Sequence, residues 1–87
     1  MVNHSWTEED DIKVLYITLY GYTKLYPTKK SVAKIIGVSE GSLSYRIGNF
    51  KAIQGIGKAT NYAKLSKKVY DTYHLKRQAI LKNLASL

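Results

Sequence analysis

Two groups of apolar residues at helical spacing flank a glycine near the middle of this chain. Val32 and Ala33 precede Gly37. Leu43 and Ile47 follow it, about one helical turn apart. A small residue such as Ala33 lets two helices pack closely, and glycine adopts the positive φ that a sharp turn requires. The spacing therefore predicts two short helices that meet at an angle, the pattern known as helix-turn-helix.

The acidic segment near the amino terminus predicts a first helix. Thr7 precedes four acidic residues, Glu8 to Asp11, and the third of them is Asp10. This order is typical of a capping box, in which Thr7 and Asp10 each accept a backbone amide at the helix start. Gly21 is expected to end the helix. The acids also complement the positive end of the helix dipole, so we interpret them as a helix start rather than as a metal or catalytic site.

Capping residues and breaks divide the rest of the chain. Thr28 and Ser39 are expected to cap a second and a third helix. Residues 51–63 contain glycines without a steady apolar period, and we predict a loop there. Residues 64–87 contain neither glycine nor proline, which predicts one long C-terminal helix. The expected fold is a small all-α helix-turn-helix domain of about four helices.

The far end of the predicted C-terminal helix is expected to extend beyond the domain. At about 1.5 Å per residue, a continuous helix over residues 64–87 is longer than so small a domain is wide. It must pack on a second copy, fold back or fray. We therefore divide the chain into a helix-turn-helix domain over residues 1–73 and a C-terminal helical extension over residues 74–87. The candidates for contacts in a homodimer are Ile80, Leu84 and Leu87.

The charge of the chain is large and unevenly placed. It has 14 Lys and Arg residues against 6 Asp and Glu residues, a formal net charge of +8 over 87 residues. Every basic residue lies at or after Lys13, whereas four of the acids lie at positions 8–11. Such an excess repels itself unless a polyanion binds. We therefore expect nucleic acid as the partner, above all double-stranded DNA.

The residue types argue against several other functions. The chain contains no cysteine, which excludes disulfides and thiolate metal sites and fits a reducing, cytoplasmic location. Neither histidine lies in a metal-ligand pattern, and no catalytic constellation is evident. We expect no enzyme activity, no metal and no cofactor. No apolar run has the roughly 18 residues that a membrane span needs, so no membrane contact is expected.

If the third helix enters a major groove, the exposed side chains on its first turns face the bases. The candidates for base contacts are Ser42, Tyr45, Arg46 and Asn49. Arg46 suits guanine and Asn49 suits adenine. Two alternatives stay open, because Asn49 also fits a helix-end residue and Tyr45 a half-buried core residue. The candidates for phosphate contacts are Lys29, Lys30, Lys34, Lys51, Lys58, Lys64, Lys67 and Lys68.

Four segments resemble a known family: residues 6–9, 32–37, 41–50 and 64–71. They are similar to the helical DNA-binding domain that precedes HNH-type nuclease modules in bacterial restriction endonucleases. The most particular shared feature is Gly48-Asn49-Phe50. The resemblance implies DNA contact through the third helix and a structural role for these three residues at its end. We expect such a domain here without a nuclease module, and the loop after Phe50 lacks the Asp-Pro pair of the family.

Two functions are consistent with these patterns. The first is a small basic DNA-binding protein, a transcriptional regulator of a phage or mobile element, which docks its third helix in the major groove. The alternative is a phage-encoded inhibitor of a host defence complex, such as an RNA-guided (CRISPR) nuclease, which acts by binding protein or guide RNA. The basic charge argues against a DNA mimic, since a mimic must be acidic.

Overall fold

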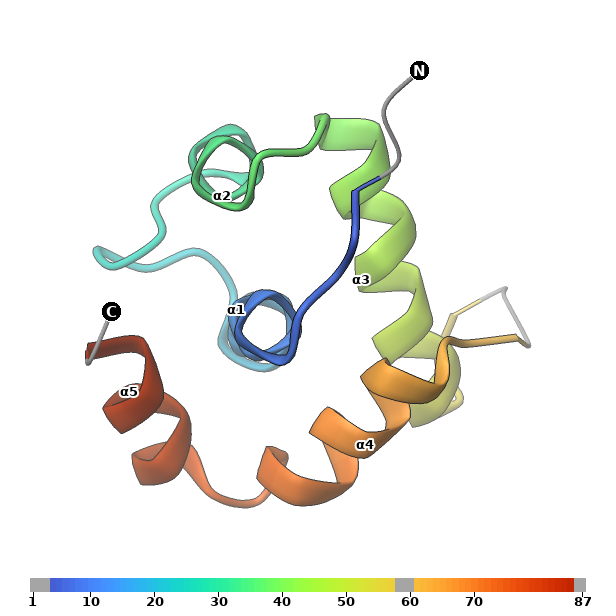
Figure 1. Cartoon of the computed structure of the whole chain (residues 1–87). Coiled ribbons are helices and arrows are strands. Elements are labelled where there is room, and N and C mark those ends of the chain that lie inside the picture. The colour runs from blue at the N-terminus through green and yellow to red at the C-terminus, as the bar shows by residue number, and fades with distance from the viewer. Residues whose placement is uncertain (1–3, 58–60, 86–87) are drawn as a thin grey trace.

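The first helix, α1 (Glu8–Tyr20), lies at the centre of the fold, and the other helices surround it (Figure 1). The computed structural model describes residues 4–57 and 61–85, and these ranges hold five helices and no strand. The remaining helices are α2 (Lys29–Ile36), α3 (Glu40–Gln54), α4 (Lys64–Tyr73) and α5 (Arg77–Ala85). α1 contacts α3, α4 and α5, and α2 packs on α3. The all-α class is confirmed, with five helices in the described residues rather than about four.

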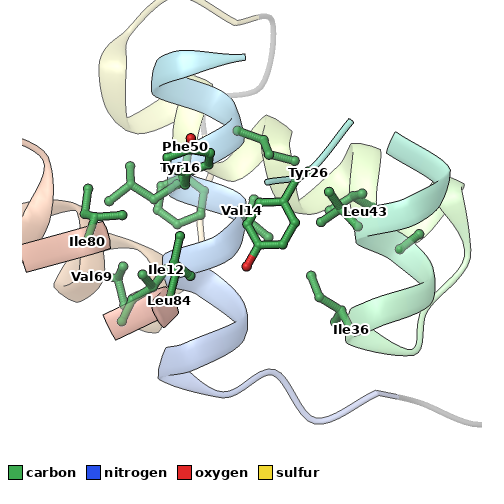
Figure 2. Packing of buried hydrophobic residues seen from close by; sticks show 14 residues of the cluster. Ile12, Val14, Tyr16, Tyr26, Ile36, Leu43, Phe50, Val69, Ile80 and Leu84 are labelled. Atoms are coloured by element: carbon green, nitrogen blue, oxygen red, sulfur yellow. The ribbon is translucent and has the colours of Figure 1, made fainter. Parts of the chain in front are cut away.

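α1 is central because it is buried on nearly all sides. Every residue from Asp11 to Ile17 is buried. Its apolar side chains share one cluster with Phe50 of α3, Val69 of α4 and Ile80 of α5 (Figure 2). A helix that is buried around its whole circumference belongs in the interior of a domain. α1 therefore fixes the positions of the three helices that pack on it.

The predicted helix starts are confirmed, and each depends on local hydrogen bonds. The Thr7 hydroxyl accepts the Asp10 amide at 3.1 Å, and the Asp10 carboxylate accepts the Thr7 amide at 3.1 Å. These two bonds form the predicted capping box of α1. Thr28 caps α2, and Ser39 caps α3 by accepting the Ser42 amide at 3.1 Å. Local sequence therefore sets where the first three helices begin.

Glycines end α1 and α2 at the predicted positions. Gly21 follows α1, and Gly37 follows α2 with a left-handed φ of 92°. The amides of Gly37 and Val38 both donate to the Ala33 carbonyl, at 2.8 and 2.9 Å. A side chain at position 37 would strain this conformation. The turn directs α3 across the axis of α2 (Figure 1).

α3 is longer than the sequence pattern indicates. The prediction of a loop over residues 51–63 is wrong at its start, because α3 continues to Gln54. Ile53 packs against the core, so tertiary contacts stabilise this last turn. Gly55 then ends the helix with a φ of 76°.

The prediction of one long C-terminal helix is also wrong, because the chain turns after Tyr73 and α5 is short. The Tyr70 carbonyl accepts both the His74 amide at 2.9 Å and the His74 ring nitrogen Nδ1 at 2.7 Å. The rings of Tyr70 and His74 also stack, with centroids 4.3 Å apart. The Lys76 amide donates to the Tyr73 carbonyl at 2.8 Å. These contacts close α4, and α5 folds back onto α1.

α5 belongs to the same core as the other helices and is not a separate extension. Ile80 is 0% exposed, and Leu84 is buried beside it. Both are in one cluster with Ile12 of α1 (Figure 2). Their predicted role as dimer contacts is therefore corrected, because side chains enclosed by their own chain cannot contact a second copy. Leu87 lies outside the described residues.

Candidate nucleic-acid interface

The solvent-facing side of α3 carries small side chains along its centre. Gly41, Ser44 and Gly48 follow one another at intervals that place them on one helix face. Gly41 and Ser44 are exposed, and Gly48 is half-buried. We call these three residues the α3 ridge. Because their side chains are short or absent, the backbone of α3 lies close to the surface along this line.

The packing of the described chain does not require glycine at either end of the α3 ridge. A Cβ atom added at Gly48 would meet nothing within 4 Å, and one added at Gly41 would meet only the Ser39 hydroxyl at 3.8 Å. Neither glycine has a positive φ. A glycine inside a helix is about 1 kcal/mol less favourable than alanine. The two glycines therefore weaken α3 without improving its contacts with the rest of the fold.

A cavity with basic and hydroxyl-bearing walls borders the α3 ridge. It has a volume of about 370 Å³ and is lined by Ile17, Thr18, Tyr22, Lys29, Ser44, Ile47 and Lys51. The Lys29 ammonium donates to the Ser44 hydroxyl at 2.8 Å, which holds a positive charge beside the ridge. Burial raises the pKa of the Tyr22 phenol, and the charge of Glu40 raises it further. The phenol therefore stays neutral near pH 7 and can donate to an anion.

A shallower groove lies between α3 and residues 61–63. It has a volume of about 260 Å³ and is lined by Tyr45, Arg46, Asn49, Asn61, Tyr62 and Ala63. Helical spacing places Tyr45 and Lys51 on opposite sides of the α3 ridge, so the groove and the basic cavity flank it. Tyr45 is 81% exposed and Tyr62 is 45% exposed. We call this the tyrosine groove. The alternative that Tyr45 is a half-buried core residue is wrong.

Comparisons with protein-family models, with curated proteins and with solved structures give no match to this chain. The similarity to the domain beside HNH-type nucleases stays an expectation from the sequence.

Arg46, a predicted base contact, is held inside the molecule. Its Nε and Nη2 atoms donate to the two carboxylate oxygens of Asp11 at 2.7 and 2.6 Å. Asp11 is 0% exposed, and the Ser66 hydroxyl donates to it at 3.3 Å. The guanidinium also lies over the Trp6 ring, 4.8 Å from the centroid. We correct the prediction: Arg46 joins α1, α3 and α4 and is not free to pair with guanine.

Asn49, another predicted base contact, is also engaged within the chain. Asn49 is only 7% exposed. Its Nδ2 atom donates to the Tyr45 carbonyl at 3.1 Å, and its Oδ1 atom accepts the Ala63 amide at 2.6 Å. The side chain fastens the segment before α4 to α3, so the predicted adenine contact is corrected to a structural role. Ser42 and Tyr45, the other two candidates, are exposed on α3.

The predicted phosphate contacts differ in how their ammonium groups are engaged. Those without an ion pair in the described structure are Lys29, Lys30, Lys34, Lys51 and Lys64. The Lys67 ammonium pairs with Asp71 at 2.7 Å. The Lys68 ammonium lies 3.9 Å from the Glu8 carboxylate. Exposed pairs of this kind contribute only about 0–1 kcal/mol, so both groups can exchange a carboxylate for a phosphate. Lys58 lies outside the described residues.

Residues 4–57 and 61–85 hold neither a cluster of metal ligands nor a membrane-spanning helix. No three His, Cys, Asp or Glu side chains come together there as metal ligands would. No helix in the same ranges is both long and apolar enough to cross a membrane.

Proposed function

We propose that this protein binds duplex DNA, with α2 and α3 acting as a helix-turn-helix pair and the α3 ridge facing the major groove. The observation that carries the proposal is the pair of ridge glycines, Gly41 and Gly48, which the packing of the chain does not use. A helix without long side chains on its outer face can bring its backbone close to base edges. The major groove, about 12 Å wide, admits such a helix.

Positive charge lies where the phosphates of such a duplex would run. The two strands that border a major groove flank the inserted helix on both sides. On one side of the α3 ridge, Lys29 and Lys51 line the basic cavity. On the other side, Lys64 begins α4 directly after Ala63 of the tyrosine groove. The net charge of +8 adds a long-range attraction for nucleic acid of any sequence.

Few side chains are free to distinguish one base from another. Ser42 and Tyr45 are exposed on the first turns of α3. A serine hydroxyl bonds to either a donor or an acceptor and so discriminates weakly. Arg46 and Asn49, which would discriminate best, are engaged within the chain. We therefore expect binding that depends strongly on salt and weakly on sequence.

Replacing Gly48 tests the proposal, because stability and binding should change in opposite directions. Gly48→Ala and Gly48→Leu should each raise the free energy of unfolding by up to about 1 kcal/mol, since both residues favour helix and a Cβ atom added on this solvent-facing side of α3 would meet no atom of the described chain within 4 Å. Gly48→Leu should weaken duplex binding by about tenfold or more, equivalent to about 1.4 kcal/mol, because leucine keeps the backbone of α3 away from the bases. Gly48→Ala should have a smaller effect.

The measurement is fluorescence anisotropy with a labelled duplex of mixed sequence at low salt, alongside urea denaturation of each variant. Gln78→Leu, an exposed position on α5, is the matched control for an added leucine and should bind as the wild type does. Equal affinity of Gly48→Leu and wild type would contradict the role of the ridge. No binding of the wild type to duplex at low salt would contradict the proposed function itself.

A further inference from the structure

Apart from Tyr45 on its α3 side, the tyrosine groove has no assigned role in duplex binding by the α3 ridge. We propose that it binds a single unstacked nucleobase, from a single strand or from a base extruded from a duplex. Its two aromatic side chains are Tyr45 on α3 and Tyr62 on the segment before α4. This inference shares with the proposed function only the nature of the partner, a nucleic acid.

The buried side chain of Asn49 holds the groove in shape. The Oδ1 atom of Asn49 accepts the amide of Ala63 at 2.6 Å, which fixes the backbone next to Tyr62. The Nδ2 atom of the same side chain donates to the Tyr45 carbonyl at 3.1 Å. One side chain therefore forms hydrogen bonds with the backbone of Tyr45 and with the backbone next to Tyr62. Binding to a site that is already ordered loses less entropy than binding to a mobile one.

Arg46 is a second fixed side chain that lines the groove beside Asn49. Arg46 cannot move freely, because Asp11 accepts two of its N–H donors at 2.7 and 2.6 Å. Tyrosine rings are surfaces on which bases stack in protein complexes. The groove therefore combines a wall fixed by Arg46 with two exposed tyrosine rings.

Both tyrosine rings are free to accept a partner. Over the described residues, neither Tyr45 nor Tyr62 has an aromatic contact or a hydrogen bond through its side chain. By contrast, Tyr16 and Tyr26 are buried and contact each other edge to face. Exposed apolar surface rimmed by polar groups is typical of ligand-binding grooves.

The polar groups around the rings favour a nucleobase over an aromatic side chain of a protein. Asn61 is exposed at the groove, and its amide offers both a donor and an acceptor, which matches the edge of a base. Lys64 is exposed one residue beyond Ala63, where it can meet the phosphate of the same nucleotide. A phenylalanine or leucine from a protein would leave both groups unused. A base paired in a duplex cannot enter, because its faces are covered by its neighbours.

The test uses one oligonucleotide of mixed sequence with a single 2-aminopurine, prepared in three forms. The forms are the single strand, the fully paired duplex, and a duplex in which the 2-aminopurine is bulged. The wild type should bind the single strand and the bulged duplex, and the fluorescence of the 2-aminopurine should change on binding as it stacks. Tyr62→Leu should weaken binding to these two forms by about fivefold or more, because it removes one stacking surface. Its affinity for the paired duplex should stay within about twofold of wild type.

Leu75→Ala, at an exposed position after α4, serves as the control and should leave all three affinities unchanged. Should Tyr62→Leu fail to fold, Tyr45→Leu and Asn61→Ala remain, because both side chains are exposed. Unchanged binding of the single strand in these variants overturns the inference. Duplex binding without any single-strand binding overturns it too, while the proposed function stands. Tyrosine-dependent binding of the single strand without duplex binding would support the inference and contradict the proposed function.

Discussion

Replacing Arg46 by alanine should lower the free energy of unfolding by about 3–5 kcal/mol. The variant leaves Asp11 0% exposed and without the two N–H donors that now lie 2.7 and 2.6 Å from its oxygens. The hydroxyl of Ser66, 3.3 Å away, cannot compensate a full charge. The variant also removes the cation that lies over the Trp6 ring. Small domains are stable by only about 5–15 kcal/mol, so this loss is a large fraction of the total.

Urea denaturation followed by circular dichroism measures the effect. Lys30→Ala is the control, because Lys30 is an exposed cation without an ion pair in the described structure. It should change stability by less than about 0.5 kcal/mol. The double variant Asp11→Leu with Arg46→Met should recover much of the loss, since an apolar pair no longer leaves a buried charge. A loss below about 1 kcal/mol for Arg46→Ala would mean that the guanidinium is free for another partner.

Replacing Ile80 by alanine should lower the free energy of unfolding by about 2–5 kcal/mol. Ile80 is 0% exposed and fills space between α5 and α1 (Figure 2). Removal of its side chain leaves a cavity that the surrounding helices fill only in part. The effect should not depend on protein concentration, because the lost contacts lie within one chain.

Gln78→Ala on the exposed face of α5 is the matched control for this substitution. It should leave stability nearly unchanged, since alanine also favours helix. The denaturation of Ile80→Ala is best combined with light scattering at several concentrations. If the wild type is a dimer, and Ile80→Ala is a monomer with the stability of the wild type, the prediction of a C-terminal dimer contact is restored.

The features predicted correctly from the sequence depend on residues close together in the chain. The capping box of Thr7 and the turn at Gly37 each involve hydrogen bonds over three to five residues. Their signals are residue types with strong local preferences, which tertiary contacts here reinforce. This is why the first three helix starts could be placed from the sequence.

The break between α4 and α5 depends on long-range packing instead. No glycine or proline lies in residues 64–87, so nothing local requires the helix to end. α5 folds back because Ile80 and Leu84 gain a place against α1. The interruption of the apolar stripe at Lys76 and Arg77 was the available signal, since a continuous helix would bring these cations onto its buried face.

The candidate site was mispredicted where a polar residue lies on a buried face. The sequence pattern groups Asp11 with the acids of the helix start, although Asp11 is the first residue of the buried run that ends at Ile17. Arg46 lies one turn after Leu43 and one turn before Phe50, on the inner side of α3. Asp11 and Arg46 each fall on the apolar face of their helix. Two opposite charges in such positions could have been predicted to pair. The tyrosine groove could not be predicted, because no local pattern indicates the hydrogen bond from the Ala63 amide to Asn49, which holds the residue next to Tyr62 against α3.

We expect the α3 ridge to face the nucleic acid, and the decisive experiment is an amide NMR titration of the full chain with a short duplex. The largest shift changes should occur at Gly41, Ser44 and Gly48 and on the walls of the basic cavity. The amides around Ile80 on the opposite helix α5 should change little. Changes centred on α5, or none at equal concentrations of protein and duplex in low salt, would contradict it.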